Sequence, residues 1–103
     1  MKTPEGFEKD DIDDFLLLLG PDRCWAFKPY MAGFGKSGVP DYCLCICGAF
    51  WGIEVKRPRK DPTAIQSRRM NEIRKAGGHA VAGTAEVVIA ELRAWLAVRG
   101  IVV

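Results

Sequence analysis

The sequence predicts a single α/β domain in which helices flank one central mixed sheet. Its 103 residues suffice for one hydrophobic core and are too few for two. Three segments place apolar residues at helical spacing, and four short apolar or aromatic runs between turn-forming residues predict strands. The predicted order along residues 1–103, taken as one domain, is helix, three strands, helix, strand and helix.

The first helix is predicted over about residues 5–19. Ile12, Phe15, Leu16 and Leu19 recur at helical spacing after an acidic first turn, and Gly20-Pro21 supplies the stop. The segment "CWAFKPY" that follows predicts a short aromatic strand.

The next segment, "MAGFGKSGVP", is rich in glycine and predicts a loop. Its "GKS" invites comparison with a phosphate-binding P-loop, which would make the chain a nucleotide-binding protein. That motif requires glycine where this chain has Tyr30, and it leads straight into a helix, whereas here Gly38-Val39-Pro40 intervenes before a strand. We therefore do not favour the nucleotide-binding alternative.

Two strands are predicted over residues 42–47 and 50–56, joined by a hairpin turn at Gly48-Ala49. A second helix is expected to begin with Asp61 as N-cap and Pro62 at its first position, and to end at Gly77-Gly78. "HAVAG" then predicts a strand. A third helix, capped by Thr84, is expected to run to about residue 98.

Charge is distributed unevenly, although the net charge is only +2. Residues 1–14 carry a net charge of −4 and residues 54–75 carry +5, which suggests a polyanionic partner on one side. No segment is apolar over the ~20 residues of a membrane helix, and the N-terminus lacks the layout of a secretory signal. We expect no membrane partner and a cytoplasmic location.

Four cysteines raise the question of a metal site or disulfides. Cys43, Cys45 and Cys47 alternate and are expected on one face of a strand, and Cys24 is distant in sequence. Structural zinc sites normally use two pairs of ligands, each with two to four residues between its members, and neither a second pair nor a nearby histidine is evident here. Buried free thiols are therefore favoured, and zinc remains the alternative.

The hairpin brings charged residues together. A two-residue turn at Gly48-Ala49 pairs Cys43 with Glu54 and Asp41 with Lys56, so that both carboxylates and the lysine share one face at a diagonal of roughly 7–8 Å. A turn longer by one residue would place Asp41 on the other face. The opposite face of the second strand, with Trp51, Ile53 and Val55, is expected to supply the core.

Two carboxylates beside an ammonium suit metal-assisted phosphodiester hydrolysis. Carboxylate oxygens hold Mg²⁺ or Mn²⁺, the metal activates water, and the lysine orients or deprotonates that water. A cross-strand ion pair on a solvated face is the alternative for the same residues.

The sequence resembles a known nuclease family. "VPD" followed by "EVK" resembles the PD-(D/E)xK superfamily, whose fold is restriction-endonuclease-like. "KPYMAGFGKSGVPDY", "GIEVKRPRKDPTAIQ" and "AGGHAVAGT" together resemble its VRR-NUC group, especially small stand-alone members from bacterial viruses. If the chain is encoded by a virus, its location is the cytoplasm of the bacterial host.

The resemblance implies roles for particular residues. Asp41, Glu54 and the Val55 carbonyl would bind metal, Lys56 and Gln66 would act in catalysis, and an acidic residue of the first helix would join them. Glu5 is the best match for that acid, with Glu8 left open.

The resemblance also implies a metal-dependent endonuclease acting on branched DNA, such as Holliday junctions or flaps, and working as a homodimer. A nucleic-acid-binding module without catalysis is the main alternative. In either setting, six basic residues are expected to contact phosphates: Lys36, Arg57, Arg59, Lys60, Arg68 and Arg69.

Overall fold

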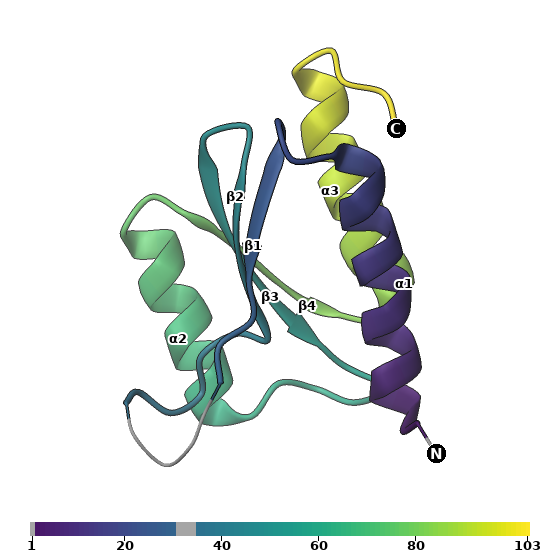
Figure 1. Cartoon of the computed structure of the whole chain (residues 1–103). Helices are drawn as coiled ribbons and strands as arrows, with labels where there is room; N and C mark the ends of the chain where they lie inside the picture. Colours follow the sequence, from purple (N-terminus) through teal and green to yellow (C-terminus); the bar gives the residue numbers. More distant parts are fainter. Residues whose placement is uncertain (1, 31–34) are drawn as a thin grey trace.

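The predicted order of elements is confirmed by a computed structural model, which describes residues 2–30 and 35–103. Residues 31–34 of the glycine-rich loop, and with them part of "GFGKS", lie outside the described residues. The elements are α1 (Pro4–Leu19), β1 (Cys24–Phe27), β2 (Tyr42–Ile46), β3 (Ala49–Val55), α2 (Ala64–Lys75), β4 (His79–Gly83) and α3 (Ala85–Val98). Figure 1 shows α1 and α3 together on one side of the sheet and α2 on the other.

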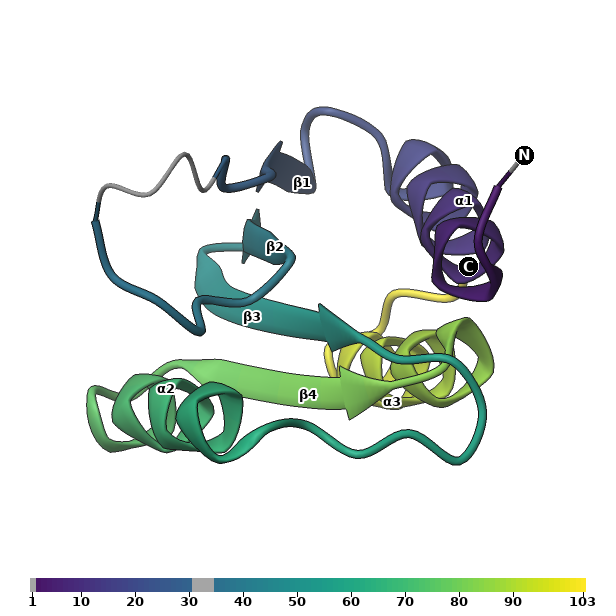
Figure 2. The same ribbon diagram turned by 90° about the horizontal axis from the view of Figure 1, so that it is seen from below.

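The sheet is mixed, as expected. Its strands lie in the order β1-β2-β3-β4; the first three are antiparallel, and β3 pairs parallel with β4. Figure 2 shows the strands stacked in this order, with α2 beside one face and α1 and α3 beside the other. None of the helices in residues 2–30 and 35–103 is long and apolar enough to cross a membrane.

The core lies between the sheet and the pair α1 and α3. Alternate residues of β2 and β3 point into it, among them Tyr42, Leu44, Trp51 and Ile53, all buried. This confirms the expectation that Trp51 packs in the core instead of stacking on a nucleic-acid base. The hydrophobic stripes of both helices supply the remaining members: Ile12, Phe15, Leu16, Leu19, Val88, Leu92 and Leu96.

The other face of the sheet is covered by α2 near β3 and β4, and Gly52 makes the close approach possible. A Cβ atom at Gly52 would lie 2.8 Å from Ile73 Cδ1 and 2.9 Å from Pro40 Cγ. Because Gly52 has no side chain, α2 and the segment before β2 both pack tightly against β3, two residues before Glu54. Met70 of α2 is buried there.

The predicted hairpin register is wrong by two residues. The turn is Cys47-Gly48, with φ of 48° and 84°, and not Gly48-Ala49. Cys43 therefore pairs with Gly52 instead of Glu54. A slip of two residues leaves every side chain on its face, so Asp41 and Glu54 still share one side. Continuing the register beyond the Tyr42–Ile53 pair sets Asp41 directly opposite Glu54.

The cysteines are free, as expected, but they do not gather on one face, and Cys45 and Cys47 are exposed instead of buried. Cys47 sits in the turn, and Cys24 pairs with Ile46 and packs against the core, on the face opposite Cys43 and Cys45. Burial raises the pKa of the Cys24 and Cys43 thiols. Over the part of the chain that the structure describes, no group of three or more histidine, cysteine, aspartate or glutamate side chains is placed to hold a metal ion.

The second helix begins two residues later than expected. Its N-cap is Thr63, not Asp61, and the Thr63 hydroxyl accepts a hydrogen bond from the Gln66 backbone N–H. In return, Gln66 Oε1 accepts one from the Thr63 N–H at 2.9 Å, which completes a capping box. These reciprocal bonds satisfy two free N–H groups at the helix start, whereas capping by Asp61 would satisfy one.

Candidate active site

The structure brings Asp41 and Glu54 together on the side of the sheet that carries α2. Asp41 precedes β2, and its Oδ2 accepts a hydrogen bond of 2.8 Å from the Val55 N–H. This bond ties the aspartate to the strand that carries Glu54. Whether the Val55 carbonyl joins a metal site, as the resemblance implies, stays a prediction.

Glu54 is not on an open face, contrary to expectation, because the start of α2 covers it. The residue is only 3% exposed. Its Oε1 accepts a 3.0 Å hydrogen bond from Gln66 Nε2, and its Oε2 is buried with no hydrogen-bond partner. The pKa of Glu54 is raised to about 8, chiefly by burial; the nearby charge of Asp41 adds to this shift, and that of Lys56 opposes it.

Lys56 lies at the edge of this buried pair. Its Nζ is 3.9 Å from Glu54 Oε1, and its side chain is 12% exposed. Its backbone N–H donates to the Gly83 carbonyl, which continues the pairing of β3 with β4 beyond the strand ends. The ammonium is therefore held between the carboxylates and solvent.

A cavity of about 620 Å³ adjoins these residues. One wall is the first turns of α1, and the other is the segment that runs from β3 to α2. Its lining is mostly charged or polar: Thr3, Pro4, Glu5, Gly6, Lys9, Lys56, Arg57, Lys60, Asp61 and Thr63. The cavity gives an anionic ligand access to Lys56.

The two acids of α1 have different surroundings. Glu8 Oε2 accepts a 3.3 Å hydrogen bond from the Ala85 N–H and so holds α1 to the start of α3. Glu5 lines the cavity, and its charge contributes to the raised pKa of Glu54. Glu5 is thus the acid that faces the site, although it does not join Asp41 and Glu54 in a group of three within the described residues.

The donor atoms fit a hard divalent cation. Glu54 Oε2 is a buried oxygen without a protein partner, and the raised pKa of Glu54 shows that a proton or a cation is favoured there. Asp41 supplies a second carboxylate, and Mg²⁺ and Mn²⁺ prefer such oxygen ligands.

Five of the six expected phosphate-binding residues fall into two groups. Arg57 and Lys60 line the cavity. Lys36, Arg68 and Arg69 instead surround Glu72 on α2, at 3.9, 3.8 and 3.1 Å.

The basic residues also differ in how freely they can reach a ligand. Arg69 is engaged in the fold, since its Nε donates to the Ser37 carbonyl at 2.8 Å and its side chain is only 16% exposed. Arg59 is exposed, and unlike its basic neighbours Arg57 and Lys60 it has a positive φ. Lys36 and Arg68 pair with Glu72 only at 3.8–3.9 Å and keep most of their side chains exposed. The residues that can meet a polyanion are therefore Lys36, Arg57, Arg59, Lys60 and Arg68.

Sequence analysis missed Lys9. Its Nζ lies 3.5 Å from Asp41 Oδ1, and the residue lines the cavity. The signal in the sequence was its spacing of four from Glu5, which puts both on the same side of the helix. Without the packing of α1, nothing indicated that this side faces Asp41.

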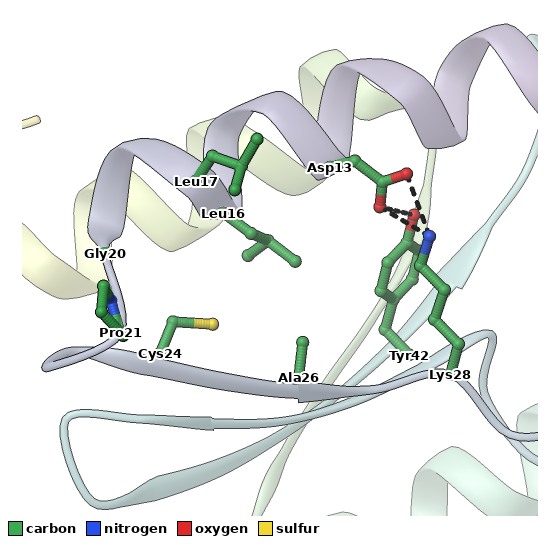
Figure 3. A pocket seen from close by; sticks show the side chains of 9 residues that line it. All are labelled: Asp13, Leu16, Leu17, Gly20, Pro21, Cys24, Ala26, Lys28 and Tyr42. Carbon is green, nitrogen blue, oxygen red and sulfur yellow. Dashed lines mark hydrogen bonds and ion pairs between the residues drawn. The ribbon is translucent and has the colours of Figure 1, made fainter.

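A second cavity, of about 410 Å³, lies between α1 and β1 and is mainly apolar (Figure 3). At one end the Tyr42 hydroxyl donates to Asp13 Oδ1 at 2.7 Å, and Lys28 donates to the same carboxylate. These contacts fix α1 against the strand that follows Asp41, so this region positions the site without lining it.

His79 packs among aromatic side chains of the fold. Its ring stacks on Trp51 with centroids 4.6 Å apart and meets Trp95 edge-on.

Comparison with known proteins identifies the fold. No family model and no curated protein matches the sequence. A solved structure described as a "VRR_NUC domain" matches with a TM-score of 0.72 and 25% identity, over 88% of this chain and 95% of that chain. The shared fold supports placing this chain in the VRR-NUC family, which is a family of nuclease-type domains.

Proposed function

We propose that this chain is a metal-dependent endonuclease that hydrolyses phosphodiester bonds in DNA. One observation carries the proposal. Asp41 and Glu54 converge beside Lys56, and Glu54 Oε2 is buried without a partner next to a cavity lined by cationic side chains. A solvated cross-strand ion pair does not account for a glutamate that is only 3% exposed.

Each side chain has a distinct role in this proposal. Asp41 and Glu54 hold Mg²⁺ or Mn²⁺, with the Val55 carbonyl and Glu5 as further candidates. A bound ion of this kind lowers the pKa of water and polarises a phosphate oxygen. Lys56 orients the attacking water or takes its proton, and Gln66 fixes the orientation of Glu54 through its 3.0 Å hydrogen bond.

DNA is the proposed substrate because the cavity and its surroundings are basic. Lys56, Arg57 and Lys60 line the cavity, and Arg59 is exposed beside them. Such residues bind phosphates without reading sequence, which suits an enzyme that recognises DNA shape. We propose branched DNA, of the Holliday junction or flap type.

A homodimer is proposed because one apolar surface is left uncovered by residues 2–30 and 35–103. Trp25, Phe27 and Phe50 are 68%, 52% and 44% exposed on the part of the sheet that α2 does not reach. The hollow of about 440 Å³ that they line has no charged residue in its walls, so two copies can meet there without repulsion.

The exposed area of these three aromatic residues also supports a second copy of the chain as the partner. A fully buried aromatic side chain covers about 150–250 Å², so the three rings contribute roughly 250–400 Å² toward the ~800 Å² per partner of a stable interface. The free edge of β1, which carries Trp25 and Phe27, supplies further contact.

The nuclease proposal is tested with labelled four-way junctions, flaps and linear duplexes in Mg²⁺, Mn²⁺ or EDTA. We expect metal-dependent cutting of branched DNA that Asp41→Ala and Lys56→Ala abolish, and that Asp14→Ala, an exposed change on α1, preserves. Binding of DNA without cutting under all conditions would favour the non-catalytic alternative. Wild-type activity in Asp41→Ala would refute the site.

Sedimentation of the wild type and of Trp25→Glu tests the dimer separately. We expect a dimer at micromolar concentration for the wild type and a folded monomer for the variant. A monomeric wild type refutes the dimer and leaves the nuclease proposal standing.

A further inference from the structure

Lys9 is placed against the site by a rigid contact. The Tyr42 hydroxyl lies 3.1 Å from the Lys9 backbone carbonyl and 2.7 Å from Asp13 Oδ1, and Tyr42 is buried. Tyr42 directly follows Asp41. Consecutive residues at the start of β2 therefore contact one side of α1, and this sets the Lys9 side chain over Asp41.

The four carboxylate oxygens of the site have unequal partners. Asp41 Oδ2 is held by the Val55 N–H, and Glu54 Oε1 by Gln66 Nε2. Glu54 Oε2 has no partner, and Asp41 Oδ1 has Lys9 Nζ at 3.5 Å. The first two donors are fixed by a strand and by a helix cap, whereas the lysine has a long flexible side chain that is 39% exposed. Asp41 Oδ1 is thus the paired oxygen whose partner can leave most easily.

We propose that Lys9 is an exchangeable counter-ion: it pairs with Asp41 in the metal-free protein, gives up that place when a divalent cation binds, and then contacts a phosphate of the DNA. This inference rests on the proposed function. It assigns to Lys9 a role that couples metal loading to substrate binding.

The cavity supports the second half of this exchange. Lys9 lines the same cavity as Lys56, Arg57 and Lys60, so an ammonium released from Asp41 remains beside the residues that face a phosphate. Before metal binds, the positive charge of Lys9 is largely neutralised by Asp41. Metal binding therefore adds one free cationic group to the DNA-binding surface.

Manganese affinity tests the first half of the exchange. Titration calorimetry with Mn²⁺ should show about 2–5-fold tighter binding to Lys9→Met than to the wild type, because a competing partially exposed ion pair is worth up to about 1 kcal/mol. Lys2→Met is the matched control, since Lys2 lies just before α1 and pairs with Asp10 of that helix, both with exposed side chains. It should bind Mn²⁺ as the wild type does, and Lys9→Arg should also stay near wild type.

DNA affinity tests the second half of the exchange and is measured once in Ca²⁺, a divalent cation that also takes carboxylate oxygen ligands, and once in EDTA. Lys9→Met should bind a junction several-fold more weakly than the wild type in Ca²⁺, and equally well in EDTA. The slope of log affinity against log salt should fall by about one in Ca²⁺ only. A lysine with a merely structural role, or one that always contacts phosphate, predicts the same change in both conditions.

The outcomes separate this inference from the proposed function. If the wild type binds Mn²⁺ and Glu54→Gln does not, while Lys9→Met has unchanged or weaker Mn²⁺ affinity, the exchange is refuted and the metal site stands. Equal losses of DNA affinity in Ca²⁺ and EDTA also refute it. If the wild type binds no Mn²⁺, both proposals fail together.

Discussion

Replacing Glu54 by glutamine should make the metal-free protein more stable at alkaline pH. Glu54 has an ordinary pKa of 4.5, and in the folded protein burial raises this pKa to about 8. Between these values the folded protein keeps a proton that the unfolded chain has released. The free energy of unfolding therefore falls as pH rises from about 4.5 to 8, and Glu54→Gln removes this loss.

The magnitude follows from the size of the shift. Each pKa unit corresponds to about 1.4 kcal/mol, so the full shift sets a ceiling of roughly 5 kcal/mol. Because the charges of Asp41 and Lys56 act on Glu54 in opposite directions and the site relaxes, we expect about 2 kcal/mol, or on the order of 10 °C in Tm for a chain of this size. Glutamine keeps the oxygen that accepts from Gln66 Nε2.

The assay is urea unfolding of both proteins in EDTA from pH 5 to pH 9. The difference in unfolding free energy between Glu54→Gln and wild type should grow across this range, whereas Glu91→Gln, an exposed change on α3, should give a constant difference. Adding Mg²⁺ or Mn²⁺ at pH 8 should then stabilise the wild type and not Glu54→Gln. A difference that stays constant within 0.5 kcal/mol from pH 5 to 9 would show that Glu54 is not a buried titrating group.

Three further predictions concern the surroundings of the site. Gly52→Ala should destabilise the fold by about 1–3 kcal/mol in urea unfolding, because its Cβ would lie within 3 Å of Ile73 and Pro40; no change would mean that α2 packs less closely. Thr63→Ala should lower the free energy of unfolding by about 1 kcal/mol through loss of the N-cap, and it should also slow DNA cleavage by loosening Gln66. Unaltered cleavage would mean that the cap does not affect the site. Arg69→Met should lower stability by about 1–3 kcal/mol, while Arg68→Met should change it by less than 0.5 kcal/mol and weaken DNA binding in a filter assay; the reverse pattern would refute the distinction between them.

Periodicity in the sequence was enough to predict the elements, because the buried stripes of α1 and α3 and the alternation in β3 reflect one core. It could not predict the hairpin register, since Cys47 adopts a positive φ that is uncommon for this residue type, and the pattern at Gly48-Ala49 looked equally suited to a turn. The start of α2 could have been predicted from the sequence, because Thr63 and Gln66 have the spacing of a capping box. Asp61-Pro62 gave a competing signal.

The sequence predicted that Asp41, Glu54 and Lys56 share one side of the sheet, but it did not predict their surroundings. The side on which Asp41, Glu54 and Lys56 lie depends only on the two-residue period of a strand, so it survived the error in register. The burial of Glu54 depends on how closely α2 approaches across Gly52, and the contact of Lys9 with Asp41 depends on how α1 crosses the sheet. Both are properties of packing between distant segments, which local patterns do not encode.

The capping box at the start of α2 has one more consequence, for the choice between glutamine and glutamate at position 66. A helix start is served by either residue, because only a side-chain oxygen is needed to accept from the N-cap N–H. Here the oxygen of Gln66 is committed to Thr63, so the remaining end of the side chain must face Glu54. An amide presents N–H to that carboxylate, and a carboxylate would present a second negative charge. The helix alone permits both residues, and the neighbouring acid selects the neutral one.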